Sequence, residues 1–381
     1  MSFLPDVTPL LPSLHWIESG QPHTALWRSE AAVLPPQRVV VADDTLSAPA
    51  ACHLAAQGTA MLWRGDFQNA KQLVQAMGRR LDGKPVKTAP SDLLTAFHQH
   101  RMHQAQRARA LGMLLLPFEG GHVLPLRRAP DVQAACTEAY GPCDAPYVAS
   151  LRELLGLLGA HEWRKKGVGI AELGARIHPH YGVYSPVRGE YLKLIAQEPL
   201  PNTASAFDVG TGTGVIAALL ARRGVAHVMA TDTDARALAC AQDNLTRLNL
   251  TNQVQLLQTD LFPPGRAPLV VCNPPWLPAK PSAPIERAIY DPASQMLRGF
   301  LAGLKNHLEP GGQGWLILSD LAEHLGLRSR EQLLAWIAGA GLQVLGRSDV
   351  RPTHSKTQDA NDPLHGARAA EITSLWRLGY L

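Results

Sequence analysis

The residues of this 381-residue chain that are best suited to chemistry form the run Asn273-Pro274-Pro275-Trp276. Asn273 offers a side-chain acceptor oxygen, Pro274 a backbone carbonyl and Trp276 a flat aromatic face. Two prolines in succession hold these groups rigid, because proline fixes φ and restrains the residue before it. The run is suited to gripping a planar group that carries an NH₂. For these four residues alone, a rigid turn is the alternative interpretation.

A glycine-rich segment, Asp208-Val209-Gly210-Thr211-Gly212-Thr213-Gly214, lies upstream and precedes an apolar helix predicted at 215–221. Glycines let a backbone approach a ligand closely, and a helix N-terminus offers free N–H groups. A dinucleotide fingerprint would place its third small residue at position 215, where this chain has valine. The spacing therefore argues against a nicotinamide-dependent oxidoreductase.

Alternating strands and helices must position these residues. Strands are predicted at 206–209, 226–230, 254–257 and 269–272, with a helix at 235–248 between the second and third. Asp232 and Asp260 follow two of the strands, and Asp232 lies 24 residues after Asp208. Ligands of open parallel sheets bind at the carboxyl ends of strands, so the glycines, the acids and the Asn-Pro-Pro-Trp run should meet at one edge. Taken singly, each aspartate could instead be a helix N-cap.

In this order the motifs resemble the S-adenosylmethionine site of class I methyltransferases of the small-domain (MTS) group, which carry Asn-Pro-Pro-[Phe/Tyr/Trp]. The resemblance covers the chain from 171 onward and implies S-adenosylmethionine as the cofactor. It places the methionine part near the glycine loop, the ribose hydroxyls on Asp232, the adenine near Asp260, and the methylated group on Asn273 to Trp276. The implied catalytic residues are Asn273, Pro274, Pro275 and Trp276, and the implied cofactor-binding residues are Asp208, Gly210, Thr211, Gly212, Gly214, Asp232, Thr233, Asp260, Leu261 and Asn273.

The resemblance also implies an α/β fold class, with a Rossmann-like seven-stranded sheet that is mostly parallel and has an antiparallel last strand. Further strands are predicted at 314–319, 343–350 and 371–378, and helices within 283–308 and at 330–340. A smaller α/β domain, 1–170, is expected to precede the methyltransferase domain, 171–381, and to recognise the substrate. In it we predict a short helix near 14–18, strands at 38–42, 59–63 and 122–128, and helices at 68–81, 92–115, 130–140 and 147–158.

Two substrate classes compete. The segment Gly182-Val183-Tyr184-Ser185-Pro186 resembles the stretch before the cofactor fold in release-factor glutamine methyltransferases and in two-half ribosomal-RNA guanine-N2 methyltransferases. A hydrophobic turn before a helix at 191–196 explains the same residues. By this resemblance the substrate-binding candidates are Tyr184, Pro186, Arg188 and Tyr290.

A protein glutamine is favoured by Leu277-Pro278 and Tyr290-Asp291, and a nucleobase amino group (guanine N2 or adenine N6) by the long N-terminal half and the run from Glu162 to Gly167. Each of the two enzyme groups differs from this chain in one feature. The glutamine enzymes usually have a smaller N-terminal helical domain, and the RNA enzymes usually have Phe-His after Asn-Pro-Pro. We favour the protein substrate, a translation factor or ribosomal protein, over RNA; a non-catalytic binding module is a remoter alternative.

Composition sets broader limits. The chain is 46% hydrophobic and 18% charged, with a net charge of +4, which is compatible with nucleic-acid binding without indicating it. Five cysteines without a Cys-x-x-Cys pair, no signal-peptide pattern and no apolar run of membrane length predict a cytoplasmic protein. His98, His100 and His103 lack metal-ligand spacing, so we expect no metal and a solvated basic helix face.

Overall fold

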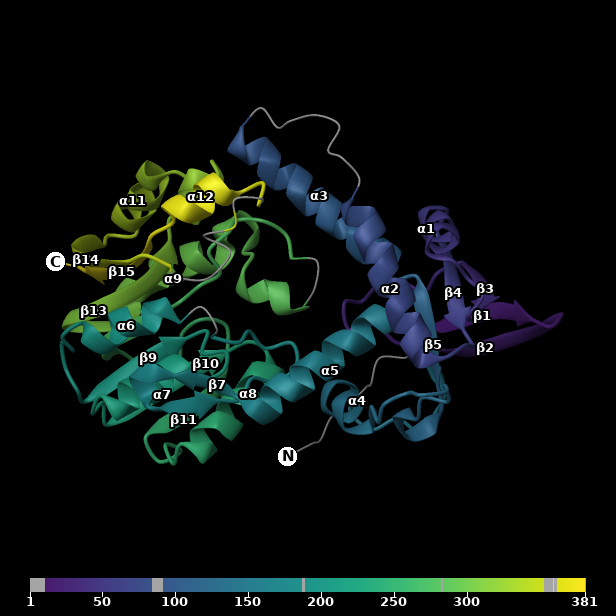
Figure 1. Cartoon of the computed structure of the whole chain (residues 1–381). Coiled ribbons are helices and arrows are strands. Elements are labelled where there is room, and N and C mark those ends of the chain that lie inside the picture. The colour runs from purple at the N-terminus through teal and green to yellow at the C-terminus, as the bar shows by residue number, and fades with distance from the viewer. Residues whose placement is uncertain are drawn as a thin grey trace. The chain divides into compact units, whose positions relative to one another are not determined.

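The structure is a computed structural model that describes residues 11–83, 92–186, 189–281, 284–352, 359 and 362–380. The chain divides into two compact units (Figure 1). Unit 1 comprises Met1–Ala89 and Arg101–His161, and unit 2 comprises Pro90–His100 and Glu162–Leu381. Two of the three crossings between the units lie within helices α3 (Leu93–Leu111) and α5 (Leu151–Lys166), and the last falls after His161, whereas a boundary near 170 was expected.

Unit 1 is built on a six-stranded mixed sheet of order β1-β2-β6-β5-β4-β3. β1 (Ser13–Glu18) and β2 (Gln21–Trp27) form an antiparallel hairpin, and β3 (Arg38–Ala42), β4 (Thr59–Trp63) and β5 (Leu114–Phe118) are parallel. β6 (Tyr147–Ser150) runs antiparallel to β5. Helices α1 (Ala48–Ala56), α2 (Phe67–Asp82) and α4 (Gln133–Tyr140) complete the unit.

Several predictions in unit 1 were wrong in type. The short helix expected at 14–18 is strand β1, which turns into β2 through Ser19 and Gly20, both at positive φ. The strand expected at 122–128 is replaced by the 3₁₀ turn Gly120–His122 and a loop. The helices expected at 92–115 and 147–158 include residues of β5 and β6. Short apolar runs fit a buried strand or a helix equally well, and here pairing with neighbouring strands decides between them.

Unit 2 contains the predicted seven-stranded sheet, of order β11-β10-β9-β12-β13-β15-β14. Only β15 runs antiparallel to its neighbours, as expected of the last strand. The strands are β9 (Ser205–Val209), β10 (His227–Asp232), β11 (Val254–Gln258), β12 (Ala267–Cys272), β13 (Leu308–Ser319), β14 (Gln343–Val350) and β15 (Thr373–Gly379). The sheet is Rossmann-like, with β9 and β12 adjacent at its centre, where the strand order reverses.

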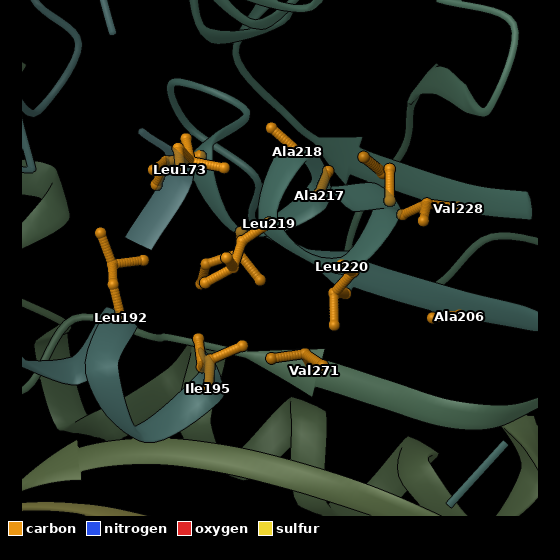
Figure 2. Packing of buried hydrophobic residues seen from close by; sticks show 14 of the residues in the cluster. Leu173, Leu192, Ile195, Ala206, Ala217, Ala218, Leu219, Leu220, Val228 and Val271 are labelled. Carbon is orange, nitrogen blue, oxygen red and sulfur yellow. The ribbon is translucent and has the colours of Figure 1, made fainter. Parts of the chain in front are cut away.

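Helices cover both faces of this sheet. α6 (Glu190–Gln197) and α7 (Val215–Arg222) bury their apolar residues in one core cluster, while α9 (Gln295–His307) and α11 (Arg330–Gly339) pack in another. Figure 2 shows Leu192 and Ile195 of α6 beside Leu219 of α7 and Val271 of β12. Burying each such side chain stabilises the fold by about 1.5–3 kcal/mol. These clusters hold the strand ends, and the loops on them, in place.

Smaller elements complete unit 2. α8 (Ala235–Arg247) follows β10, α10 (Leu321–His324) follows β13, and α12 (His365–Ala370) precedes β15. β7 (Val168–Ile170) and β8 (Ala175–Ile177) form the antiparallel hairpin before α6. Within the part of the chain that the structure describes, no helix combines the length and apolarity needed to cross a membrane.

Candidate functional site

A cavity of about 650 Å³ lies at the carboxyl ends of β9, β10, β11 and β12. Loops that are far apart in the sequence meet there, as the strand order predicts. The sequence-predicted residues that line it are Tyr184, Pro186, Gly210, Thr211, Gly212, Asp232, Thr233, Asp260, Leu261, Asn273, Pro274, Pro275 and Trp276.

The glycine loop between β9 and α7 takes a conformation that only glycine adopts easily. Gly212 has φ +54, and Gly214 has φ +79 at the N-cap of α7. At Gly212 an added Cβ would meet nothing within 4 Å, whereas at Gly214 it would lie 3.1 Å from the Ala241 Cβ on α8. The backbone at Gly212 is therefore open to a ligand, while Gly214 permits close packing between two helices.

Asp208 lies beneath this loop and does not line the cavity. Its Oδ2 accepts hydrogen bonds from the Thr211 hydroxyl at 2.7 Å and the Ala217 N–H at 3.0 Å, and its Oδ1 has no partner. Burial raises the pKa of Asp208 to about 7. In this structure the carboxyl organises the loop, and its predicted contact with the methionine part of a cofactor stays a prediction.

Asp232 ends β10 and connects to the same loop. Its Oδ2 accepts the Gly212 N–H and its Oδ1 the Asp234 N–H, both at 3.0 Å. Each carboxylate oxygen keeps acceptor capacity for a ligand hydroxyl. Burial is the main cause that raises the pKa of Asp232. The geometry is thus compatible with the predicted ribose contact.

The loop after β11 presents Asp260 and Leu261 to the cavity. Asp260 is exposed, and Leu261 has φ +58, which is strained for a side chain of this size. The Thr231 hydroxyl, on β10, donates to the Leu261 carbonyl at 2.5 Å and holds this conformation. Thr231 is a supporting residue that the sequence argument missed.

The Asn-Pro-Pro-Trp run leaves the end of β12. The Trp276 indole N–H donates to the Asn273 Oδ1 at 2.9 Å. Tyr191 lines the cavity from α6 and was not predicted as a site residue. The oxygen of the Asn273 amide is consequently held by Trp276, in addition to the stiffness that Pro274 and Pro275 provide.

The segment after this run is pinned by the chain around residue 290. The Leu277 N–H donates to the Ile289 carbonyl at 3.1 Å, and the Asp291 N–H donates to the Leu277 carbonyl at 2.8 Å. The buried Asp291 carboxylate accepts the N–H groups of Met296 and Leu297 at the start of α9. Asp291 therefore joins the acceptor loop to α9. Two 3₁₀ turns, Pro284–Ala288 and Pro292–Ser294, flank it.

Tyr290, a predicted substrate residue, forms a parallel β-bridge with Leu277 and does not line the cavity. Its neighbour Asp291 does line the cavity. Of the segment before α6, Tyr184 and Pro186 line the cavity, and Arg188 lies outside the described residues.

Asn244 on α8 holds the chain at His178, just before the segment that contains Tyr184 and Pro186. It accepts the His178 N–H at 2.7 Å and donates to the Thr213 carbonyl in the glycine loop at 3.0 Å. Next to it, His180 Nε2 lies 2.8 Å from the Asp243 carboxylate. Asn244 is another residue that sequence reasoning missed, since nothing in the spacing marks a buried asparagine on an amphipathic helix.

The cavity is acidic. Its charged lining residues, within the described chain, are four carboxylates and one arginine: Asp232, Asp234, Asp260, Asp291 and Arg287. Such a lining suits a ligand that carries positive charge. No cluster of three or more His, Cys, Asp or Glu side chains in the described ranges is placed to hold a metal ion.

Comparison with known proteins agrees with this geometry. Residues 175–329 match the family model of the methyltransferase small domain. The chain is 36% identical over 124 residues to a release factor glutamine methyltransferase of Cereibacter sphaeroides, covering 29% of this chain and 45% of that protein. It is 37% identical over 155 residues to that of Moorella thermoacetica, covering 35% and 54%.

A tRNA1(Val) (adenine(37)-N6)-methyltransferase of Parabacteroides distasonis is 42% identical over 74 residues, covering 18% of this chain and 31% of that protein. The chain spans about half the length of the glutamine methyltransferases it matches. The match to the methyltransferase small-domain model, over residues 175–329, includes the glycine loop and the Asn-Pro-Pro-Trp run.

Proposed function

We propose that this protein is an S-adenosylmethionine-dependent N-methyltransferase that methylates the side-chain amide of a protein glutamine. The observation that carries the proposal is the convergence of the glycine loop, Asp232 and the Asn273 amide on one cavity. The cavity's residues fit the cofactor in two respects. The backbone at Gly212 is open to a ligand, and the acidic lining suits a sulfonium that also bears an ammonium group.

Bound in this cavity, S-adenosylmethionine supplies an electrophilic methyl group. Asp232 and the glycine loop would hold it, and the chain's remaining task is to orient the acceptor. An amide nitrogen is a weak nucleophile because its lone pair is delocalised into the carbonyl. The Asn273 Oδ1 and the Pro274 carbonyl would accept the two N–H bonds of the acceptor. As the nitrogen gains positive charge, these bonds strengthen, which favours the transition state.

Two observations support a protein amide over a nucleobase. Arg287 is the single basic residue among the described lining, whereas nucleic-acid binding depends on cations placed near phosphates. Over comparable stretches the chain is also more similar to release factor glutamine methyltransferases, at 31–37% identity over 124–173 residues, than to tRNA adenine-N6 methyltransferases, at 26–29% identity over 140–157 residues. The second candidate, an adenine-N6 or guanine-N2 methyltransferase acting on RNA, is supported by the Parabacteroides tRNA enzyme and by the flat face of Trp276.

Unit 1 would then contribute substrate recognition only. Asp66 follows β4 at the position where a parallel sheet binds ligands, but it is buried and bonded to Arg127 and Arg128. Its other oxygen accepts the Gln68 N–H at the start of α2. The protein itself engages both oxygens of this carboxylate, so Asp66 is not available to a cofactor. We therefore assign unit 1 a role in recognition and not in catalysis.

The decisive test is transfer of a labelled methyl group from S-adenosylmethionine to a cell extract by the full-length protein. We expect label that protease releases and ribonuclease does not. Label released by ribonuclease would favour the nucleobase. Calorimetry with S-adenosylhomocysteine should show binding, and NADH should not. An absence of heat with S-adenosylhomocysteine would remove the enzyme proposal.

A further inference from the structure

Two adjacent arginines of unit 1, Arg127 and Arg128, lie in the loop before α4, and their side chains are 74% and 57% exposed. Both nevertheless bond through Nε to the same oxygen of Asp66, Oδ2, at 2.9 and 2.6 Å. The Asp66 side chain is fully buried. A buried carboxylate therefore fixes two guanidinium groups that are largely open to solvent.

The arginine loop is also tied to the first turn of α2. The Phe67 N–H donates to the Arg127 carbonyl at 3.0 Å, and the Gln68 side-chain amide donates to the Arg128 carbonyl at 3.4 Å. The Gln68 backbone N–H donates to the second oxygen of Asp66 at 2.8 Å. Side chains that are held in place before a ligand arrives lose less conformational entropy on binding, so this loop is preorganised for a contact.

The backbone of Arg128 is strained, with φ +55. A residue other than glycine seldom takes this conformation, and such strain gathers at functional sites. Neutralising Asp66 does not account for the strain, because Arg127 already pairs with the same carboxylate oxygen. The second arginine therefore adds a positive charge that the buried acid does not need.

Most donors of the two guanidinium groups remain available. Only Nε–H of each is used, and neither arginine makes another hydrogen bond or ion pair within the part of the chain that the structure describes. Asp44, a second carboxylate near this corner, instead accepts the Asp66 N–H at 2.9 Å and the Asn69 side-chain amide at 3.0 Å. Two neighbouring guanidinium forks match the paired oxygens of anionic groups.

We propose that Arg127 and Arg128 bind acidic side chains on the surface of the protein acceptor. The inference rests on the proposed function, since a protein acceptor presents carboxylates, and it names the chemistry by which unit 1 recognises that acceptor. RNA phosphates would suit the same forks. Carboxylates are favoured because Arg287 is the single basic residue among the described lining of the cavity in unit 2, whereas RNA binding depends on many cations.

The test measures binding of a fluorescent oligoglutamate peptide to the full-length protein by anisotropy. Arg127→Gln removes one fork and leaves Asp66 paired with Arg128, so the urea midpoint should stay at the wild-type value. The affinity for the peptide should fall about threefold or more, the scale of an exposed charge pair. Added salt should weaken wild-type binding, because the contact is exposed.

The matched control is Arg79→Gln. Arg79 lies in the last turn of α2 in the same unit, is exposed, and its substitution removes the same charge. This variant should bind the peptide as the wild type does. A peptide that does not bind, or an affinity that Arg127→Gln leaves unchanged or that Arg79→Gln lowers equally, would overturn the inference.

A single-stranded oligoribonucleotide is the competing probe. If it binds through Arg127 while the peptide does not, the site holds phosphates and the inference is wrong. In the transfer assay, Arg127→Gln should lower the labelling of extract protein and leave the Kd for S-adenosylhomocysteine unchanged. If the wild type transfers no methyl group at all, the proposed function fails, and the peptide affinities still decide whether the two arginines bind carboxylates.

Discussion

At the scale of single residues, the site contains two kinds of polar side chain. Some face the cavity, and others hold the loops and helices that shape it. Asp208 accepts from the Thr211 hydroxyl and Thr231 donates to the Leu261 carbonyl, both in loops, while Asp291 accepts N–H groups of α9. Asn273 is the exception, since its oxygen is held by Trp276 and retains a second lone pair for the cavity. Substitutions should therefore separate residues that shape the site from the residue that contacts the acceptor.

Asn273→Ala should lower turnover by at least ~100-fold, the scale of a lost transition-state hydrogen bond, and leave cofactor affinity near normal. The reason is that its oxygen is proposed to contact the acceptor and not the cofactor. Methyl transfer and calorimetry with S-adenosylhomocysteine measure the two effects. A variant with normal turnover would refute the role given to Asn273.

Asp232→Ala should act in the opposite way and weaken cofactor affinity by roughly tenfold or more, as expected for charge-assisted hydrogen bonds. It removes both a proposed ribose contact and the acceptor of the Gly212 N–H. Asp234→Ala is the control, because that carboxylate lines the same cavity and caps α8 without contacting the glycine loop. Equal affinities of the wild type and Asp232→Ala would discredit the ribose assignment.

Asp208→Asn should change how stability depends on pH. The folded-state pKa of about 7 lies above the usual 3.8, so the folded protein binds this proton more tightly than the unfolded chain. The resulting stability is present below pH 3.8 and is lost as the pH rises through 7. Asparagine mimics the protonated acid and does not titrate.

Urea denaturation at pH 5 and pH 8 tests this prediction. Between these values the wild type should lose at least about 1 kcal/mol relative to Asp208→Asn. A constant difference between the two proteins would show that Asp208 is already ionised at pH 5 in the folded state.

At the scale of elements, the site is assembled where helices and strand ends meet at close range. Gly214 lets α7 begin directly against α8, and Asn244 on α8 bonds both to the glycine loop and to His178. Asp291 likewise joins a loop of the site to a helix, because its carboxylate accepts N–H groups at the start of α9. The loops are thus positioned by neighbouring helices as well as by the strands from which they emerge.

Gly214→Ala should destabilise the protein by about 2 kcal/mol or more. A side chain at φ +79 costs about 1–2 kcal/mol, and its Cβ would also press on Ala241 at 3.1 Å. Gly311→Ala is the control, because its φ is +75 and its Cβ would meet nothing within 4 Å. Urea denaturation should give a smaller loss for Gly311→Ala. Equal losses would mean that the contact between α7 and α8 is not tight.

At the scale of the whole molecule, the proposal assigns cofactor binding to unit 2 and substrate recognition to unit 1. Every described residue that lines the cavity belongs to unit 2. Unit 1 has its own sheet and its own buried cluster, which includes Leu14, Trp27 and Leu115. Damage inside unit 1 should accordingly leave cofactor binding intact while it lowers transfer to a macromolecular acceptor.

Asp66→Ala tests this division. It removes the N-cap of α2 and leaves Arg127 and Arg128 without their shared carboxylate. Losing the cap alone should cost about 1 kcal/mol of stability. Denaturation should show this loss, while calorimetry should give a Kd for S-adenosylhomocysteine within about twofold of the wild type. A large loss of cofactor affinity would show that unit 1 supports the cofactor site.

The sequence by itself determined the order of strands and helices in unit 2 and the set of residues that would converge. Hydrophobic periodicity and turn-forming residues are local properties of the sequence. The carboxyl ends of parallel strands meet at one edge wherever such a sheet forms. In unit 1 the same local signals misjudged β1, β5 and β6, whose character depends on partner strands distant in the chain.

Only the tertiary structure decided which polar groups face the cavity and which hold it together. Asp208 lies behind the glycine loop, Asp291 lines the cavity where Tyr290 does not, and Tyr191 of α6 lines the same cavity as Asn273. Hydrogen bonds between residues dozens of positions apart depend on packing distances of a few tenths of an ångström, and no spacing in the sequence encodes them.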